Sequence, residues 1–162
     1  MGRGIDRYNA ERTTFEQNIK LIPLLIKMSE KYKITAKIDC SFVPMLCYHK
    51  PPKELLYSMA TYGCEAGNVL LGIKSNGKVS GCSFLESEGL SVLDLPKKFS
   101  NSFQRERTVA NNISEPCKSC DYLDICKGGC HGISLHISGV YEDPDPYCPF
   151  VEEYRNKNRE KK

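Results

Sequence analysis

The stretch that decides the fold is residues 117–130, CKSCDYLDICKGGC, where cysteine recurs after gaps of two, five and three residues. A Cys-x2-Cys step, as at Cys117 and Cys120, lets two thiolates reach one metal centre from a tight turn. Gly128 and Gly129 stand just before Cys130 and allow the backbone to bend and approach a bulky group. The segment is therefore predicted to be a metal-binding loop with little regular structure.

Working outward, Cys64 and Cys82 stand on either side of a predicted hairpin formed by residues 69–74 and 78–82. The Asn76-Gly77 pair between these runs is the strongest short hairpin signal, because both residues of such a turn need positive φ. A hairpin returns its two ends to within reach of each other, so both thiols can meet at one metal. Downstream, Cys148 follows Cys130 after a gap of seventeen residues.

The chain has 162 residues, nine cysteines and a formal net charge of +3. The odd cysteine count and the lack of a visible secretory signal argue against a disulfide framework. The longest apolar run, residues 21–26, is too short for a membrane span and contains Pro23. We expect a reducing, cytoplasmic setting, where clustered cysteines are more often metal ligands. The small charge predicts neither a nucleic-acid nor a membrane partner.

Seven cysteines follow the pattern, and Cys40 and Cys47 stand outside it. Seven ligands are one fewer than two four-cysteine sites require, which is an awkward number for two structural zinc ions. The same number is natural for two iron–sulfur clusters, one complete and one with an open or non-cysteine position.

The spacing resembles the C-terminal SPASM domain of radical S-adenosylmethionine (radical SAM) enzymes. That family pattern is a cysteine, nine to fifteen residues, Gly-x4-Cys, a gap, Cys-x2-Cys-x5-Cys-x3-Cys, a gap and a last cysteine. Every element is present between Cys64 and Cys148, including Gly77. More weakly, Gly2-Arg3-Gly4 and the helix that follows resemble the end of the family's partial (β/α)6 barrel.

The resemblance implies two auxiliary [4Fe–4S] clusters with interleaved ligands. It assigns Cys64, Cys82 and Cys130 to the first cluster. The second cluster takes the remaining four cysteines of the pattern: Cys117, Cys120, Cys126 and Cys148. Some family members supply an upstream cysteine as the fourth ligand of the first cluster. Cys47 is the nearest such candidate here, with Cys40 behind it.

The sequence lacks the Cys-x3-Cys-x2-Cys loop that holds the cofactor-cleaving cluster of radical SAM enzymes. S-adenosylmethionine is therefore expected only in a barrel that this chain does not contain, and the chain alone is not expected to be catalytic. A truncated protein, a split gene product and a stand-alone cluster carrier are all compatible with this pattern.

Three functions remain open at this point. The leading one is the auxiliary-cluster part of a radical SAM enzyme that modifies a peptide or protein, where the domain relays electrons and helps bind the substrate. Its partners would be the radical SAM barrel, on the same or a separate chain, and the peptide substrate. The second is a ferredoxin-like electron carrier. The third is a zinc-binding interaction module, although the sequence lacks a basic patch with interleaved aromatic residues.

The predicted fold class is irregular α+β, with a small β-hairpin and cysteine-rich loops around two metal clusters, flanked by helices. Residues 1–45 are predicted to be the barrel remnant, 46–63 a linker with a helix, 64–150 the cluster domain and 151–162 a frayed charged tail. Apolar periodicity and capping signals predict helices at 13–32, 51–62, 96–104 and 149–155. Thr13 and Glu16 form the predicted capping box of the first helix, and Pro23 is expected to kink this helix or to set off its first part as a separate turn. Loose alternation predicts a strand at 34–40 and a second hairpin from 133–137 and 140–141.

Overall fold

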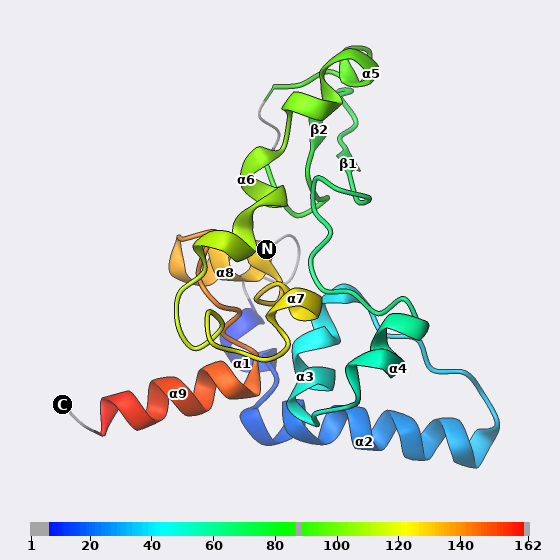
Figure 1. Cartoon of the computed structure of the whole chain (residues 1–162), viewed down its shortest axis with the longest axis vertical. Helices are drawn as coiled ribbons and strands as arrows, with labels where there is room; N and C mark the ends of the chain where they lie inside the picture. Colours follow the sequence, from blue (N-terminus) through cyan, green and yellow to red (C-terminus); the bar gives the residue numbers. More distant parts are fainter. Residues whose placement is uncertain (1–6, 87–88, 161–162) are drawn as a thin grey trace.

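The computed structural model describes residues 7–86 and 89–160, so that Gly2-Arg3-Gly4 and the last two lysines of the predicted tail lie outside the described residues (Figure 1). About half of the chain is helical, and a small two-stranded antiparallel sheet accompanies the helices, which confirms the irregular α+β class. Figure 1 shows a helical lower body from which a narrow arm extends.

Seven α-helices and a short 3-10 turn form the body. In chain order they are α1 (Tyr8–Glu11), α2 (Phe15–Tyr32), the turn η2 (Cys40–Phe42), α3 (Val43–Tyr48), α4 (Lys53–Ser58), α7 (Leu123–Cys126), α8 (His131–Ser138) and α9 (Pro149–Arg159). Helix α2 packs against α3 and α9, and α3 also packs against α7. The N-terminal helices and the C-terminal helix therefore share one packed layer.

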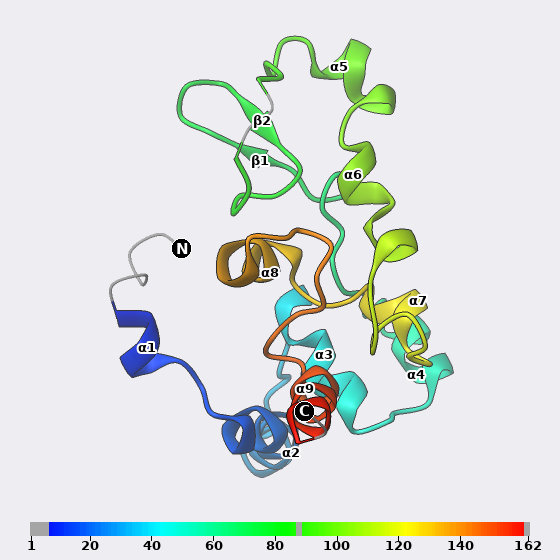
Figure 2. The same ribbon diagram turned by 90° about the vertical axis from the view of Figure 1, so that its left-hand side faces the viewer.

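The arm carries the sheet and the segment that leads back to the body, as Figure 2 shows from the side. Its elements are β1 (Gly72–Ile73), β2 (Val79–Ser80), α5 (Leu95–Lys98), η3 (Phe99–Asn101), α6 (Gln104–Arg107) and η4 (Val109–Asn112). The arm places the two strands and α5 away from the helical layer of the body, with α6 between them.

The first predicted hairpin is confirmed, although its strands are only two residues long. Gly72 pairs with Ser80 and Ile73 with Val79 in antiparallel register. Gly77 has a φ of 74°, but Asn76 does not share that left-handed conformation, so the expectation of positive φ at both turn residues is wrong. The Asn76 side chain instead accepts a hydrogen bond from the Lys78 N–H at 3.1 Å, which closes the turn locally.

Helix α2 begins one residue later than the capping signal predicted. Thr14 and Gln17 form the capping box. The Thr14 hydroxyl accepts from the backbone N–H of Gln17 at 3.2 Å, and the side-chain oxygen Oε1 of Gln17 accepts from the backbone N–H of Thr14 at 2.7 Å. A glutamine at this position performs the reciprocal bond as well as the predicted glutamate. The cap therefore shifts from Thr13 and Glu16 by one position.

Pro23 lies inside α2 and does not divide it. Because proline has no N–H, the carbonyl of Ile19 loses its usual partner four residues on. The His49 ring donates to that carbonyl from Nε2 at 2.9 Å. His49 is thus a structural residue that supplies the hydrogen bond that the proline removes.

The predicted strand at 34–40 is wrong. Residues 34–39 have no regular structure, and Cys40 begins the turn η2. A strand needs a partner with which to share its backbone hydrogen bonds. The sheet of the described residues pairs β1 with β2 alone, so this segment has none.

The second predicted hairpin is also wrong, because residues 131–138 form helix α8. The alternation of Ile133, Leu135 and Ile137 is typical of a strand, but the Cys130 carbonyl accepts from the Ile133 and Ser134 N–H groups and starts a helical turn. Gly139, with a φ of 79°, ends the helix in the left-handed conformation.

The remaining helix predictions hold in part. The helix predicted at 51–62 is the shorter α4, and the connection before it contains α3, which was not predicted. The region predicted at 96–104 holds α5 and η3. The last helix extends past residue 155 to the end of α9 at Arg159, since Pro149 at its first turn is a favourable start.

The core consists of three small apolar clusters, and cysteines take part in each. Cys47 and Cys126 belong to the first with Val43, Leu56 and Ile125. In the second, Cys64 and Cys82 pack against Ala66, Leu85, Val109 and Tyr141. The third contains Cys117 and Cys148 with Ile113 and Val151. The apolar core is therefore built around the thiols.

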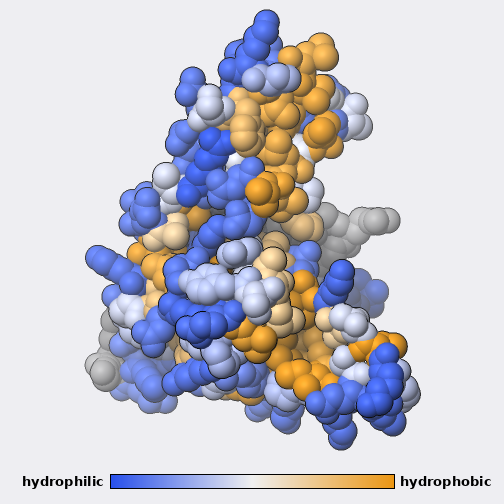
Figure 3. All heavy atoms as spheres, turned by 45° about the vertical axis from the view of Figure 1, so that its right-hand side comes forward, coloured by the Kyte–Doolittle hydropathy of each residue, from blue (hydrophilic) through white to orange (hydrophobic). Residues whose placement is uncertain are grey.

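Several large apolar side chains remain exposed on the arm. Val69 and Leu93 are each 86% exposed, and Ile73 and Phe84 are also open to solvent. Figure 3 shows apolar side chains gathered over this part of the molecule. Within the described ranges, no helix combines the length and the apolar character that crossing a membrane requires.

Candidate functional site

All nine cysteines lie within the described residues, and none of them forms a disulfide. The seven patterned cysteines fall into two groups that lie at different places in the fold. The first group, where the arm meets the body, is Cys64, Cys82 and Cys130. The second group, inside the body, is Cys117, Cys120, Cys126 and Cys148.

The base of the hairpin brings Cys64 and Cys82 together. The Gly67 N–H donates to the Gly81 carbonyl at 2.9 Å, so the chain segments that carry the two cysteines run side by side. Both thiols pack against the same apolar cluster. The hairpin geometry expected from the sequence is therefore present at the positions where the ligands are needed.

Cys130 joins this pair from the start of α8, where it is the N-cap residue. Burial raises the pKa of the Cys130 thiol to about 11, and the charge of Cys64 contributes to the increase. The pKa of Cys64 is raised by burial and by the charge of Cys82. The negative charge of one ionised thiol therefore raises the pKa of its neighbour.

Cys40 belongs to the surroundings of this first group. Burial raises the pKa of Cys40 to about 12, with further contributions from the carboxylate of Asp39 and from the charges of Cys64 and Cys130. Its thiol also donates to Asp39 Oδ1 at 3.2 Å. Of the two cysteines outside the pattern, Cys40 is the one whose pKa is raised by the charges of Cys64 and Cys130.

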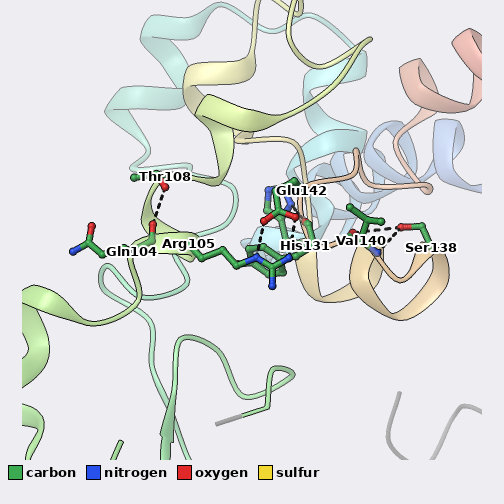
Figure 4. A network of polar contacts seen from close by, with 8 residues as sticks. Gln104, Arg105, Thr108, His131, Ser138, Val140 and Glu142 are labelled. Atoms are coloured by element: carbon green, nitrogen blue, oxygen red, sulfur yellow. Dashed lines mark hydrogen bonds and ion pairs between the residues drawn. The ribbon is translucent and has the colours of Figure 1, made fainter. Parts of the chain in front are cut away.

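A shell of polar and aromatic side chains covers the first group from the arm side. Arg105 of α6 forms a two-pronged ion pair with Glu142, at 2.6 and 2.9 Å, and its guanidinium lies 5.0 Å from the centre of the Tyr141 ring (Figure 4). Tyr141 is 2% exposed, and its pKa is raised by burial and by the charges of Cys64 and Cys82. Tyr141 thus packs in the same apolar cluster as Cys64 and Cys82.

The second group lines a pocket together with residues of α3 and α9. Burial raises the pKa of Cys148 to about 12 and that of Cys117 further still, and the charges of neighbouring cysteines add to both increases. Cys120 is half-buried and lines the same pocket. Bound metal would have to displace the protons of these thiols, since thiolate is the ligating form.

Cys47 lies in this second pocket, and not with the first group where the sequence suggested a fourth ligand. The pKa of Cys126 is raised well above its usual value, most strongly by a hydrogen bond with the Cys47 thiol and then by burial. The position of Cys47 follows from α3, a helix that was not predicted.

Asp145 connects the two groups; from the sequence, residues 143–146 are predicted only to form a rigid turn that presents Cys148. Its carboxylate accepts hydrogen bonds from the N–H groups of Cys130 and Tyr147, each at 2.8 Å. Its carbonyl accepts from the Cys148 N–H at 3.1 Å. The residue is fully buried, and burial raises the pKa of its carboxyl to about 6. A signal was present, because an aspartate between Pro144 and Pro146 is held in a rigid turn.

Two other polar residues near the cysteines have structural roles. His131 is completely buried, and its ring nitrogens lie 2.7 Å from the carbonyls of Tyr141 and Lys127. Asp124 forms an ion pair with Lys53 at 2.9 Å, which ties α7 to α4. Both residues therefore support the local fold through these contacts.

Whether the cysteines could hold a metal depends on whether the metal is a single ion or an iron–sulfur cluster. Across residues 7–86 and 89–160, no three His, Cys, Asp or Glu side chains form a group that could hold a metal ion. A cubane cluster distributes its thiolates over separate irons, so its ligands lie farther apart than the ligands of a single ion. The donor set of the second group is all thiol, and its four cysteines line one pocket, which fits such a cluster.

The comparisons with known proteins are negative. No family model, no curated protein and no solved structure matches this chain.

Proposed function

We propose that this chain is an auxiliary iron–sulfur domain that binds two [4Fe–4S] clusters and relays electrons within a radical SAM enzyme that modifies a peptide or protein. The observation that carries the proposal is the division of the patterned cysteines in space: Cys117, Cys120, Cys126 and Cys148 line one pocket, whereas Cys64 and Cys82 pack against a separate apolar cluster. All ligands are thiols, which are the donors that iron–sulfur clusters take.

The surroundings of each group suit a redox centre. Such clusters accept and release single electrons, and burial and hydrogen bonding around the ligands tune their potential. Tyr141 is buried and gives Cys64 and Cys82 of the first group an apolar neighbour. The carboxylate of Asp145 orients the backbone at Cys130 and its backbone carbonyl orients the backbone at Cys148, so one buried residue holds a ligand of each cluster.

The proposal extends to a fourth ligand for the first cluster. Cys40 supplies the missing thiolate, because its thiol lies within electrostatic reach of both Cys64 and Cys130. Cys47 does not take this role, since it lines the pocket of the second group.

This assignment predicts unequal effects of two serine substitutions. In Cys40→Ser the first cluster is expected to be lost, and iron falls from about eight to about four per chain, because a hydroxyl is a poor replacement for a soft thiolate. Cys47→Ser is expected to keep about eight. Iron and sulfide analysis after anaerobic purification measures both, and an unchanged iron content in Cys40→Ser would contradict the assignment.

The exposed apolar residues of the arm support the second part of the proposal, the binding of another polypeptide. Val69, Ile73 and Leu93 lie on one extension of the molecule and are open to solvent. Contiguous exposed apolar surface commonly marks an interaction site. The proposed occupants are the radical SAM barrel or its peptide substrate.

Anaerobic purification tests the proposed function directly. We expect a brown protein with an absorbance band at about 400 nm and with about eight irons and eight sulfides per chain. A colourless protein with about two zinc ions would overturn the proposal in favour of a zinc module. Co-purification with a chain that contains Cys-x3-Cys-x2-Cys would favour the enzyme over a free electron carrier.

A further inference from the structure

Five cysteines line the pocket of the second group, one more than a [4Fe–4S] cluster needs. Besides the four of the pattern, Cys47 contributes to its wall. Cys47 is 2% exposed, so its thiol is a buried neighbour of the ligands and faces little solvent. The pocket therefore has a surplus thiol that the spacing pattern does not assign.

The surplus thiol has one particular partner. Cys47 and Cys126 both line this pocket and belong to the same apolar cluster, between α3 and α7. By contrast, Cys117 and Cys148 belong to a different apolar cluster, with Ile113 and Val151. Cys47 is thus placed to substitute for Cys126 specifically.

The local fold holds Cys47 in this position. Val43 and Pro44 are buried at the start of α3 and fix the helix against the body. The helix packs on α7, which ends at Cys126. Neither thiol needs a large movement of the chain to exchange places with the other at one metal atom.

We infer that Cys47 is a reserve ligand of the second cluster, able to hold the iron that Cys126 otherwise holds. This inference rests on the proposed function. In the exchange, the bond from iron to the Cys126 sulfur breaks and a bond to the Cys47 sulfur forms. The Cys47 thiol gives up one proton as it binds and the released Cys126 thiolate takes up one proton, so charge and electrons balance without an oxidant or reductant.

The test compares two alanine substitutions at equally buried ligands. Cys126 and Cys117 are both 8% exposed and belong to the same loop, so the loss of packing is similar. In anaerobically purified full-length protein, Cys126→Ala is expected to keep about eight irons per chain. Cys117→Ala, which has no reserve thiol, is expected to fall to about four. Cys126→Val repeats the first test while filling the volume of the thiol.

A double variant isolates the role of Cys47. Cys47→Ala alone is expected to retain about eight irons, whereas Cys47→Ala/Cys126→Ala falls to about four. The electron paramagnetic resonance signal of the reduced second cluster should disappear only in the double variant and in Cys117→Ala. A fall to about four irons in both Cys126→Ala and Cys126→Val overturns the inference alone. A wild-type chain without iron overturns the proposed function and this inference together.

Discussion

Removal of iron is expected to unfold residues 64–148. The apolar clusters of this region are small, and each of them includes cysteines that the clusters would bind. The sheet adds only two residues in each strand. With so little other support, the bonds from iron to the thiolates would hold the arm, the cysteine-rich loop and the start of α9 together.

The magnitudes favour a complete loss of order over a local loosening. Ordering the backbone costs about 1 to 2 kcal/mol per residue, whereas a fully buried large apolar side chain returns about 1.5 to 3 kcal/mol. Clusters such as Ile113, Cys117, Cys148 and Val151 contain too few large side chains to offset the ordering of the long loops between them. If the proposed clusters bind, their bonds to the thiolates would therefore supply a large part of the free energy of folding.

The measurement is an amide proton spectrum before and after anaerobic chelation of the iron. Dispersed signals from residues 64–148 are expected to collapse to the narrow range of an unfolded chain. Reconstitution with ferrous iron and sulfide should restore them, which separates reversible unfolding from damage. Retained dispersion in the iron-free sample would show that the apolar clusters hold this region by themselves.

Sequence signals for turns and helix starts were reliable where the structure depends on neighbouring residues alone. Gly77 closes the hairpin, and Pro149 begins the last helix as expected. The alternating residues 133–137 misled, because alternation of apolar residues does not tell whether a second strand exists to pair with them. Here the Cys130 carbonyl accepts hydrogen bonds from the Ile133 and Ser134 N–H groups, and these bonds start a helix.

In the candidate site, too, some features could be predicted from the sequence and others depend on tertiary packing. The spacing pattern identified the seven cysteines, but their interleaved grouping came from the family resemblance and not from spacing. The places of Cys40 and Cys47 depend on η2 and α3, whose packing brings distant residues into contact. Asp145 acquires its role from burial, which spacing in one sequence does not reveal.

Substitution of Gly129 by alanine is expected to have a large effect on stability. Gly129 has a φ of 90°, and an added Cβ would lie 2.3 Å from the Cβ of Asp145. That contact is impossible without displacing Asp145, whose carboxylate holds the backbone of Cys130 and Tyr147. The substitution therefore disturbs the residue that positions a ligand in each of the two groups.

Gly139→Ala is the matched control, because Gly139 has a φ of 79° with open space around its Cα. Both substitutions carry the strain of alanine in the left-handed region, about 1 kcal/mol. Gly129→Ala adds the loss of two charge-assisted hydrogen bonds to a buried carboxylate, about 3 kcal/mol or more in total. At about 2 to 4 °C per kcal/mol, the apparent melting temperature should fall by roughly 10 °C in Gly129→Ala and by about 3 °C in the control. Equal decreases in the two variants, measured at one heating rate, would mean that contact with Asp145 does not constrain the loop, and that the cysteine groups are positioned by the thiols alone.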